Sequence, residues 1–327
     1  MPRHGRTPDL NRLTLPALYR ALAAGGLVRR LALLARDEDL GERGDVTSRA
    51  SVPAGAMSRA RVVARNGGVV AGLAALEEFR RVLAPRCRIV PRARDGSRVG
   101  RNTTIAVVRG PLRQILAFER PALNLLSRLS GIATRTATHA RALPRTSRAA
   151  LYDTRKTTPG LRVLEKYAVR CGGGRCHRVG LYDAVLVKDN HIAGIETREL
   201  GAHARRVARA ARRAGRPAFV EIEVDSLRQL ESVLNAQRAA PPDERIDLVL
   251  LDNMAPALLR RAAAMRDRLA PRVGLEASGG VSLATIPAIA RTGVDRISAG
   301  TLTHGATGLD LALDIDPHPA PRGGRRG

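Results

Sequence analysis

The chain has 327 residues, of which 44% are hydrophobic and 26% charged, a composition typical of a globular protein with about two domains. No apolar run reaches the roughly 18 residues that a membrane-spanning helix needs. No apolar segment follows the first charged residues, as it would in a secretory signal. These features argue against a membrane protein and predict a cytoplasmic location.

The formal net charge is +26, from 56 Lys and Arg against 30 Asp and Glu. Such a charge is typical of proteins that bind nucleic acids. Trp is absent, however, and the four Tyr and three Phe are scattered, so no surface for stacking bases is evident. We therefore expect no nucleic-acid partner and interpret the charge as a preference for arginine that also attracts small anions. Binding of RNA or DNA remains the alternative from a different class.

Three cysteines, at positions 87, 171 and 176, are an odd number in a long chain, which argues against a set of disulfides. The spacing of Cys171, Cys176 and His177 is compatible with part of a zinc site. A structural zinc ion needs four ligands, and a second such pair is missing from the sequence. We favour free thiols in a glycine-rich loop.

The first part of the chain predicts a small α+β domain over residues 14–115. Residues 1–13 and 316–327 are rich in Pro, Gly and Arg and are expected to be disordered tails. Between them, a helical pattern covers 15–36 and a turn is expected at 41–48. Alternating apolar runs at 59–73 and 97–110 then indicate an antiparallel sheet with one buried face.

Residues 116–315 show a different rhythm, in which short aliphatic runs alternate with helical patterns such as 201–215 and 225–239. This alternation predicts parallel βαβ units. Polar or glycine-rich residues follow each of six runs, which favours a TIM-like α/β barrel with its site at the carboxyl ends of the strands over an open doubly wound sheet. The six expected strands are 149–152, 184–187, 219–224, 248–251, 273–275 and 294–297.

The three lysines of the chain fall within 151–192, although arginine is otherwise used throughout. Arg155 and Arg178 each have a planar guanidinium group that can bind a carboxylate or phosphate through two hydrogen bonds. With Lys156 and His177 they suit a substrate that carries two carboxylates. We expect Lys166 to be structural.

An acidic pair follows on the next strand, where Glu221 and Glu223 point to one face. Glu223 and Asp252, at the end of the strand after it, are candidate Mg²⁺ ligands. The alternative is that they pair with Lys188 and nearby arginines. The turns at 276–280 and 298–301 expose backbone N–H groups of the kind that bind phosphate.

Several stretches in order resemble the quinolinate phosphoribosyltransferase family from about residue 14 to 315. They include GDVTS, FERPALNLLSRLSGIAT, DTRKTTPGLRVLEKYAV, GGGRCHRVGLYDAVLVKDNHI, EIEVDSL, LVLLDNM, LEASGGVS and GVDRISAGTLTH. The resemblance implies a smaller N-terminal α+β sheet domain and an incomplete, about seven-stranded barrel. It also implies a dimer or hexamer in which one subunit completes the site of its neighbour.

Residue by residue, the resemblance implies a quinolinate site formed by Arg155, Lys156, His177 and Arg178, with Arg120 from the partner subunit. Lys188, Glu223 and Asp252 would face phosphoribosyl pyrophosphate and Mg²⁺, with Ser278, Gly279 and Gly300 on its phosphate. Further expected substrate-binding residues are Thr154, Gly280, Ser298 and Ala299. The expected catalytic residues are Lys156, Lys188, Glu223 and Asp252.

The chain differs from the usual family sequence at two positions, and a related enzyme of the same fold is an alternative. Cys176 stands where the family usually has Asn, and Pro121 where Thr is more usual. The implied reaction is phosphoribosyl transfer to quinolinate with loss of CO₂, as part of NAD biosynthesis. A relative that acts on nicotinate, or on a molybdenum-associated substrate, is the alternative within the same fold.

Overall fold

The computed structural model describes residues 9–316, which form two compact units. One unit comprises 9–14 and Arg135–Ala306, and the other comprises Leu15–Thr134 and 307–316. The boundary expected near residue 115 falls inside one long helix, α5 (Leu112–Arg141). The expectations for residues 1–8 and 317–327 lie outside the described residues.

Part of the expected N-terminal tail is ordered. Leu10–Arg12 form a 3-10 helix, η1, which begins with the Asp9 side chain accepting a hydrogen bond from Asn11 N. The expectation of disorder through residue 13 was therefore wrong for these residues, because Asn11 and the backbone around it bond to the unit that contains the barrel.

The helical pattern over 15–36 corresponds to two helices, α1 (Leu15–Ala23) and α2 (Leu27–Leu40). They are separated at Gly26, whose φ of 71° is left-handed and is most easily adopted by glycine. The turn expected at 41–48 leads directly into α3 (Val46–Ser51). Asp45 caps this helix by accepting a hydrogen bond from Ser48 N at 2.8 Å, the usual role of an N-cap aspartate.

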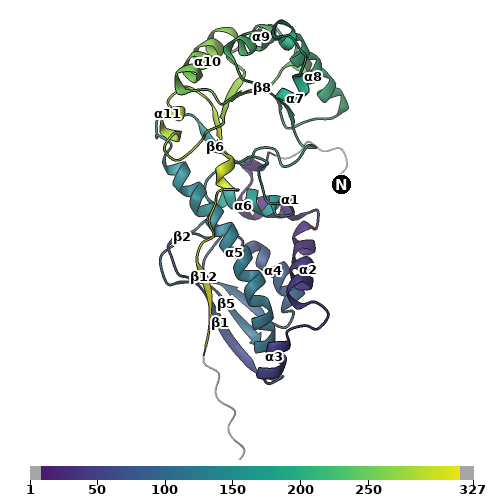
Figure 1. The fold of residues 1–327 in the computed structure, drawn as a ribbon, viewed down its shortest axis with the longest axis vertical. Helices are drawn as coiled ribbons and strands as arrows, with labels where there is room; N and C mark the ends of the chain where they lie inside the picture. The colour runs from purple at the N-terminus through teal and green to yellow at the C-terminus, as the bar shows by residue number, and fades with distance from the viewer. Residues whose placement is uncertain (1–8, 317–327) are drawn as a thin grey trace, which may run out of the picture. The chain divides into compact units, whose positions relative to one another are not determined.

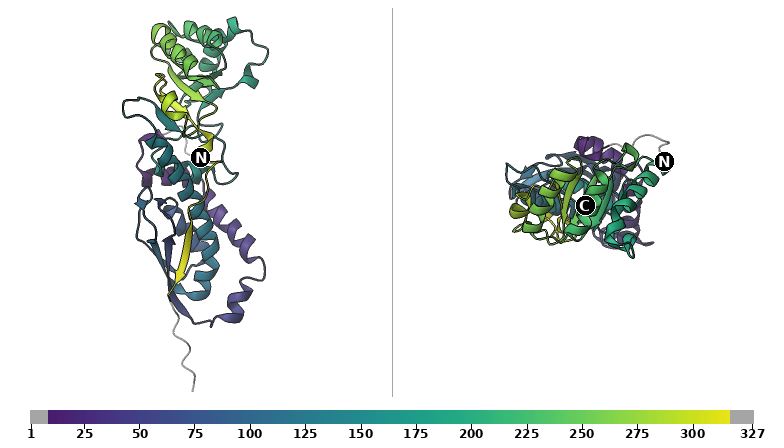
Figure 2. Two further views of the ribbon diagram at one scale, coloured as in Figure 1. Left: turned by 60° about the vertical axis from the view of Figure 1, so that its left-hand side comes forward. Right: turned by 90° about the horizontal axis from the view of Figure 1, so that it is seen from above.

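The smaller unit contains an antiparallel sheet with the strand order β12-β1-β5-β3. Its strands are β1 (Met57–Ala64), β3 (Arg88–Pro91), β5 (Thr103–Pro111) and β12 (Leu311–Ile315), accompanied by the pair β2 (Gly68–Val69) and β4 (Arg98–Val99), and by helix α4 (Leu73–Leu83). Figure 2 shows β12, the yellow strand at the end of the described chain, beside strands from its first third. The antiparallel sheet expected in the N-terminal part is confirmed, and the last strand completes its edge.

The other unit is built on six parallel strands in the order β6-β11-β10-β9-β8-β7. They are β6 (Ala150–Tyr152), β7 (Val185–Val187), β8 (Val220–Val224), β9 (Leu248–Asp252), β10 (Gly274–Ser278) and β11 (Arg296–Ser298). Each coincides with one of the runs identified in the sequence, so the predicted strands are confirmed. In place of a seventh strand, Arg175 forms an isolated parallel bridge with Tyr152 at the β6 edge.

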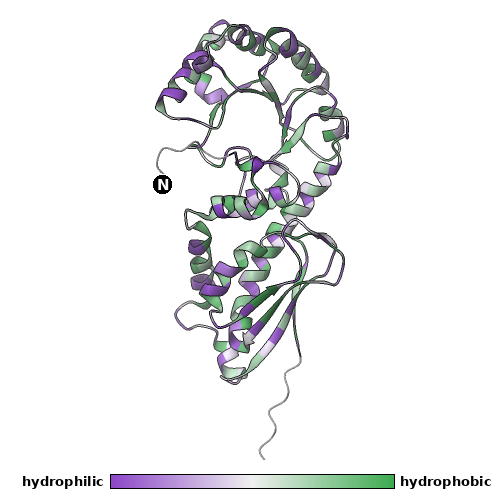
Figure 3. Ribbon diagram, turned by 180° about the vertical axis from the view of Figure 1, so that it is seen from behind, coloured by the Kyte–Doolittle hydropathy of each residue, from purple (hydrophilic) through white to green (hydrophobic). Residues whose placement is uncertain are grey.

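Helices α8 (Leu200–Ala214), α9 (Leu227–Gln237), α10 (Pro256–Leu269) and α11 (Ile286–Ala290) lie along the outer side of this curved sheet (Figure 1). The segments between its strands also contain α6 (Arg162–Cys171), the short α7 (Asp189–Ile192), and the 3-10 turns η2 (Thr197–Glu199) and η3 (Pro242–Glu244), and a further turn, η4 (Gly300–Leu302), follows the last strand. Apolar residues dominate the strands (Figure 3), and Ile222, Val249 and Leu275 are buried. Because the strands are parallel, the residues after each of them meet at one end of the sheet.

Within the described part of the chain, no helix combines the length and the apolar character that a membrane span requires.

Candidate active site

A cavity of about 440 Å³ lies at the carboxyl ends of the parallel strands. It brings together every predicted site residue except Arg120. These residues are Thr154, Arg155, Lys156, His177, Arg178, Lys188, Glu223, Asp252, Ser278, Gly279, Gly280, Ser298, Ala299 and Gly300. All lie in the unit that contains Arg135–Ala306, so segments separated by almost 150 positions in the sequence contribute to one surface.

Arg120 lies elsewhere in the structure. It is an exposed residue of α5, in the part of that helix that belongs to the smaller unit. It is not among the residues that line the cavity. Its expected role, as a cation supplied by a partner subunit, stays a prediction.

Two arginines in the cavity have unused donors. The Nε atoms of Arg155 and Arg178 are buried and have no hydrogen-bond partner among the described residues. Burial, and then the positive charge of Arg155, lower the pKa of Arg178. Placing two guanidinium groups together and away from water is unfavourable unless an anion accompanies them. The cavity is therefore arranged to receive negatively charged groups.

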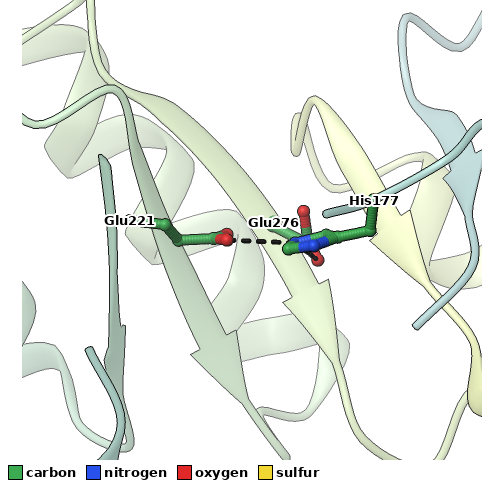
Figure 4. Close-up of side chains that lie close together, drawn as sticks. All are labelled: His177, Glu221 and Glu276. Atoms are coloured by element: carbon green, nitrogen blue, oxygen red, sulfur yellow. Dashed lines mark hydrogen bonds and ion pairs between the residues drawn. The ribbon is translucent and has the colours of Figure 1, made fainter. Parts of the chain in front are cut away.

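His177 lies between two buried carboxyl groups that come from different strands (Figure 4). Its Nε2 is 3.0 Å from Oε2 of Glu221 and 3.4 Å from Oε1 of Glu276. On the other side of Glu276, Nη1 of Arg296 is 3.9 Å from Oε2, and the Arg296 guanidinium also lies over the ring of Tyr152. The result is a layer of alternating charges across the inside of the sheet.

The carboxyl groups keep His177 positively charged. Burial would lower its pKa, but Glu276 and Glu221 raise it to about 10. The Arg178 amide lies 2.8 Å from Nδ1, and that hydrogen bond requires Nδ1 to be unprotonated. The hydrogen bond from the Arg178 amide and the doubly protonated, charged ring therefore exclude each other. The contact of Nε2 with Glu221 exists in both forms and does not distinguish them. The negative charge of Glu276, whose pKa, despite burial, is lowered by His177, favours the charged ring, which forms at the expense of the bond from the Arg178 amide.

The ligand atoms of His177, Glu221 and Glu276 lie within 4.8 Å of one another, as the ligands of a metal ion would. Positive charge from His177 and Arg296 already accompanies these carboxyl groups. We therefore interpret the cluster as an ion-pair network. The three cysteines are buried, and none of them belongs to this cluster.

Lys188 and two acidic residues also line the cavity. Lys188 follows β7 and its Nζ bonds to Oε2 of Glu223 at the end of β8. Asp252 ends β9 and accepts a hydrogen bond from Asn253 at 2.7 Å. Glu223 and Asp252 are partly exposed at the ends of adjacent strands. Two carboxylates beside open space fit Mg²⁺, which usually takes one or two protein carboxylates together with water and phosphate oxygens.

The glycine-rich turns leave little room for side chains. Gly279 has a φ of 90°, and a Cβ there would lie 2.0 Å from Oδ1 of Asn253. A Cβ on Gly300 would lie 2.9 Å from Cδ of Lys156 and 3.3 Å from Nε2 of His304. Glycine at these positions lets other groups approach the backbone closely, as a phosphate must in such turns.

Four polar residues of the cavity were missed as site residues: Asp153, Glu276, Thr301 and His304. Two of them could have been found from the sequence. Glu276 lies in the stretch LEASGG, where alternation along β10 points its side chain inward, and His304 lies in SAGTLTH, in the turn that follows β11. Asp153 directly follows β6. It pairs with Lys166, and both side chains are fully buried.

The sequence matches the models of both domains of one enzyme family. Residues 45–130 match the quinolinate phosphoribosyl transferase N-terminal domain, and residues 132–314 match its C-terminal domain. The chain belongs to the quinolinate phosphoribosyltransferase family. The fold and the family inferred from the motifs are confirmed.

Relatives of this quinolinate phosphoribosyltransferase family member span almost its whole length. The nicotinate-nucleotide pyrophosphorylase (carboxylating) of Mycobacterium leprae is 41% identical over 90% of this chain and 97% of its own. The probable enzyme of the same name from Bacillus subtilis is 39% identical over 85% of this chain and 90% of its own. The solved nicotinate-nucleotide pyrophosphorylase of Francisella tularensis matches with a TM-score of 0.78 at 31% identity, covering 95% of this chain and 100% of that one.

Proposed function

We propose that the protein transfers the phosphoribosyl group of phosphoribosyl pyrophosphate to quinolinate, yielding nicotinate mononucleotide, pyrophosphate and CO₂ in NAD biosynthesis. The observation that carries this proposal is the pair of buried arginine donors in the cavity that have no hydrogen-bond partner among the described residues. Membership of the quinolinate phosphoribosyltransferase family supports it, as do relatives named for this activity at about 40% identity.

Arg155 and Arg178 bind the two carboxylates of quinolinate in this proposal. Each Nε–H is buried and free among the described residues, so a carboxylate oxygen supplies the missing acceptor. Charge-assisted hydrogen bonds of this kind contribute roughly 1.5–3 kcal/mol each. Lys156 and charged His177 add positive potential, which favours a doubly charged acid over a singly charged one.

Other residues of the cavity bind the activated sugar. Backbone N–H groups around Gly279, Gly280 and Gly300 surround the 5-phosphate, and Lys188 binds pyrophosphate oxygens. Glu223 and Asp252 are the residues that would hold Mg²⁺. The ion, when bound, stabilises the negative charge that develops on the departing pyrophosphate. Lys188 exchanges its contact with Glu223 for a contact with the substrate.

The protein orients the reactants and stabilises charge, and the proposal needs no nucleophilic side chain. The pyridine nitrogen forms a bond to C1 of the ribose as the bond from C1 to pyrophosphate breaks. Positive charge on the sugar in this transition state is stabilised by Glu223 and Asp252. The nitrogen is then quaternary, so the electron pair left at C2 by loss of CO₂ lies beside a positive charge until C2 takes up a proton. Holding the ring at a fixed angle is the main task of the arginines.

We further propose a homo-oligomer in which Arg120 of one subunit reaches the cavity of its neighbour. Arg120 is exposed and lies outside the cavity of its own chain, so a second copy offers it a partner. Cytoplasmic localisation and the dimer or hexamer stay predictions.

The test is an assay of the purified protein with quinolinate and phosphoribosyl pyrophosphate, with and without Mg²⁺, that measures nicotinate mononucleotide and CO₂ together. We expect both products in equal amounts, with Mg²⁺ required. Nicotinate in place of quinolinate should be a poor acceptor, because one of the arginine sites would stay empty. Failure to form the mononucleotide, or equal use of nicotinate, would contradict the proposal.

A further inference from the structure

The loop that leads into His177 and Arg178 has its backbone hydrogen bonds satisfied by an unusual set of partners. Buried backbone groups are almost always paired, so each partner of this loop helps to fix its path. Arg175 bonds to β6 through its own N–H to Leu151 O at 2.8 Å and through its carbonyl, which accepts from Asp153 N at 3.0 Å. The His177 amide donates to Oδ1 of Asp153 at 2.8 Å, and its carbonyl accepts from Nζ of Lys166 at 3.2 Å.

Cys176, between them, is held from a distant part of the sequence. Its N–H donates to Oδ1 of Asn11 at 2.8 Å, and its carbonyl accepts from Nδ2 of the same side chain at 2.9 Å. The Asn11 amide therefore bonds to Cys176 as a neighbouring strand would. The other residues that bond to the backbone of the loop lie within about 30 residues of it in the sequence, whereas Asn11 is separated from Cys176 by 165 residues.

Arg170 fixes the segment that carries Asn11. Its Nη2 donates to the carbonyls of Asn11 and Leu13, at 3.3 and 3.1 Å, and its Nη1 donates to the carbonyl of Gly174 at 3.3 Å. One guanidinium thus joins the N-terminal segment to the start of the loop. Residues 9–14 also belong to the same compact unit as the cavity.

The side chain at position 176 does not face the cavity. Its Sγ is buried and donates weakly to the carbonyl of Lys166 at 3.7 Å, and Cys176 is absent from the cavity lining. The backbone of Cys176 is therefore the part of this residue that bears on the site. Its neighbours on the C-terminal side are His177 and Arg178, both of which line the cavity.

We propose that Asn11 is a positioning residue, which holds the backbone of Cys176 and thereby places His177 and Arg178 for the dicarboxylate substrate. This inference rests on the proposed function for the identity of that substrate. It assigns the N-terminal segment a part in substrate binding, in a stretch whose composition predicted disorder.

The test compares Asn11→Ala and Asn11→Asp with the wild type and with Arg12→Ala. Arg12 lies on the same 3-10 helix, with its side chain 88% exposed in an ion pair to Asp9, so its loss controls for disturbance of the helix. Asn11→Ala removes both hydrogen bonds to Cys176. Asn11→Asp keeps an acceptor for the Cys176 amide but places a second oxygen against the Cys176 carbonyl.

We expect Asn11→Ala and Asn11→Asp each to raise the KM for quinolinate roughly tenfold, the effect of losing one or two hydrogen bonds. The KM for phosphoribosyl pyrophosphate should stay within about twofold, because the groups that bind it lie on other strands. Arg12→Ala should resemble the wild type in both constants. In hydrogen exchange, the peptide containing Cys176 and His177 should exchange faster in the Asn11 variants and at the wild-type rate in Arg12→Ala.

An unchanged KM for quinolinate in the Asn11 variants would overturn the inference. So would equal changes in both KM values, or loss of activity that merely follows loss of folded protein. The exchange measurement needs no substrate, so it tests the anchoring of the loop separately. If the wild type itself does not use quinolinate, the proposed function fails, and the exchange result still decides whether Asn11 holds the loop.

Discussion

Lys188 and Glu223 form an ion pair across adjacent strands, with Nζ of Lys188 2.5 Å from Oε2 of Glu223. The lysine side chain is 44% exposed and the glutamate side chain 12%. The lysine therefore remains accessible from the cavity while it neutralises the glutamate. In the proposed reaction this pair separates when substrate arrives, which gives each partner a second role.

Replacement of Lys188 should affect turnover much more than stability. A partly exposed ion pair contributes about 0–1 kcal/mol to folding, whereas removal of a group that stabilises developing negative charge lowers kcat by about 10²–10³-fold. We expect Lys188→Ala to show the second effect and a melting temperature close to that of the wild type. The measurement is steady-state kinetics together with thermal unfolding. A parallel loss of activity and stability would show that the lysine is structural.

A shared site should be restored by mixing two inactive variants. Arg120→Ala and Lys188→Ala each disable a different part of the proposed site, so one site of a mixed dimer would contain neither change. For a dimer that exchanges subunits freely, activity should return to roughly a quarter of the wild type. Mixing each variant with itself is the control. No recovery, once subunit exchange has been demonstrated, would mean that Arg120 acts within its own chain or has no role.

The charge on His177 predicts a specific pH dependence. Its folded-state pKa is raised to about 10 from the ordinary value of 6.5, which favours the charged ring throughout the neutral range. Wild-type affinity for quinolinate should therefore vary little between pH 6.5 and 9. The contribution of this group to stability is complete below about pH 6.5 and declines as the pH rises towards 10.

Glu276→Gln removes the largest influence that raises the pKa of His177. We expect quinolinate binding by this variant to weaken at a lower pH than in the wild type, because the ring loses its proton sooner. Titration calorimetry or NMR of the imidazole nitrogens would measure this. The exposed Glu196→Gln serves as the control. A pH profile of Glu276→Gln that matches the wild type would show that Glu276 does not set the charge of His177.

The buried pair Lys166 and Asp153 should be important for folding. Both side chains are fully buried, and removal of one partner leaves the other charge without compensation, at a cost of about 3–5 kcal/mol. We expect Lys166→Met to lower the free energy of unfolding by about this amount in urea denaturation. Arg198→Ala breaks an exposed pair with Glu196 and should cost less than about 1 kcal/mol. Similar small losses in both variants would contradict the structural role of Lys166.

Much of the site was predictable because parallel strands end at one edge. Each of the runs before Asp153, Lys188 and Asp252 is a strand in the structure, and the residue after a strand is set by the sequence alone. Once the strands are parallel, these residues must converge. The order of the motifs therefore determined which groups share the cavity without any knowledge of distances.

Contacts between side chains from separate strands and loops could not be predicted in this way. Alternation along β8 and β10 shows that Glu221 and Glu276 point inward, but not that His177 lies between them. The η1 helix is too short to carry a periodic pattern, and a segment rich in Pro and Arg has the composition of a tail. Its order depends on Asn11 meeting Cys176 across 165 positions.

The sequence by itself determined the parallel strands, the residues at their ends and the family, because side-chain alternation and strand-end chemistry are local properties of the chain. The tertiary structure decided which charged side chains pair with one another. It also decided that the side-chain amide of Asn11 holds the loop that leads into His177 and Arg178. Those choices depend on the curvature of the sheet and the path of the N-terminal segment, since an ion pair or a hydrogen bond forms only where folding brings its two atoms within a few ångströms.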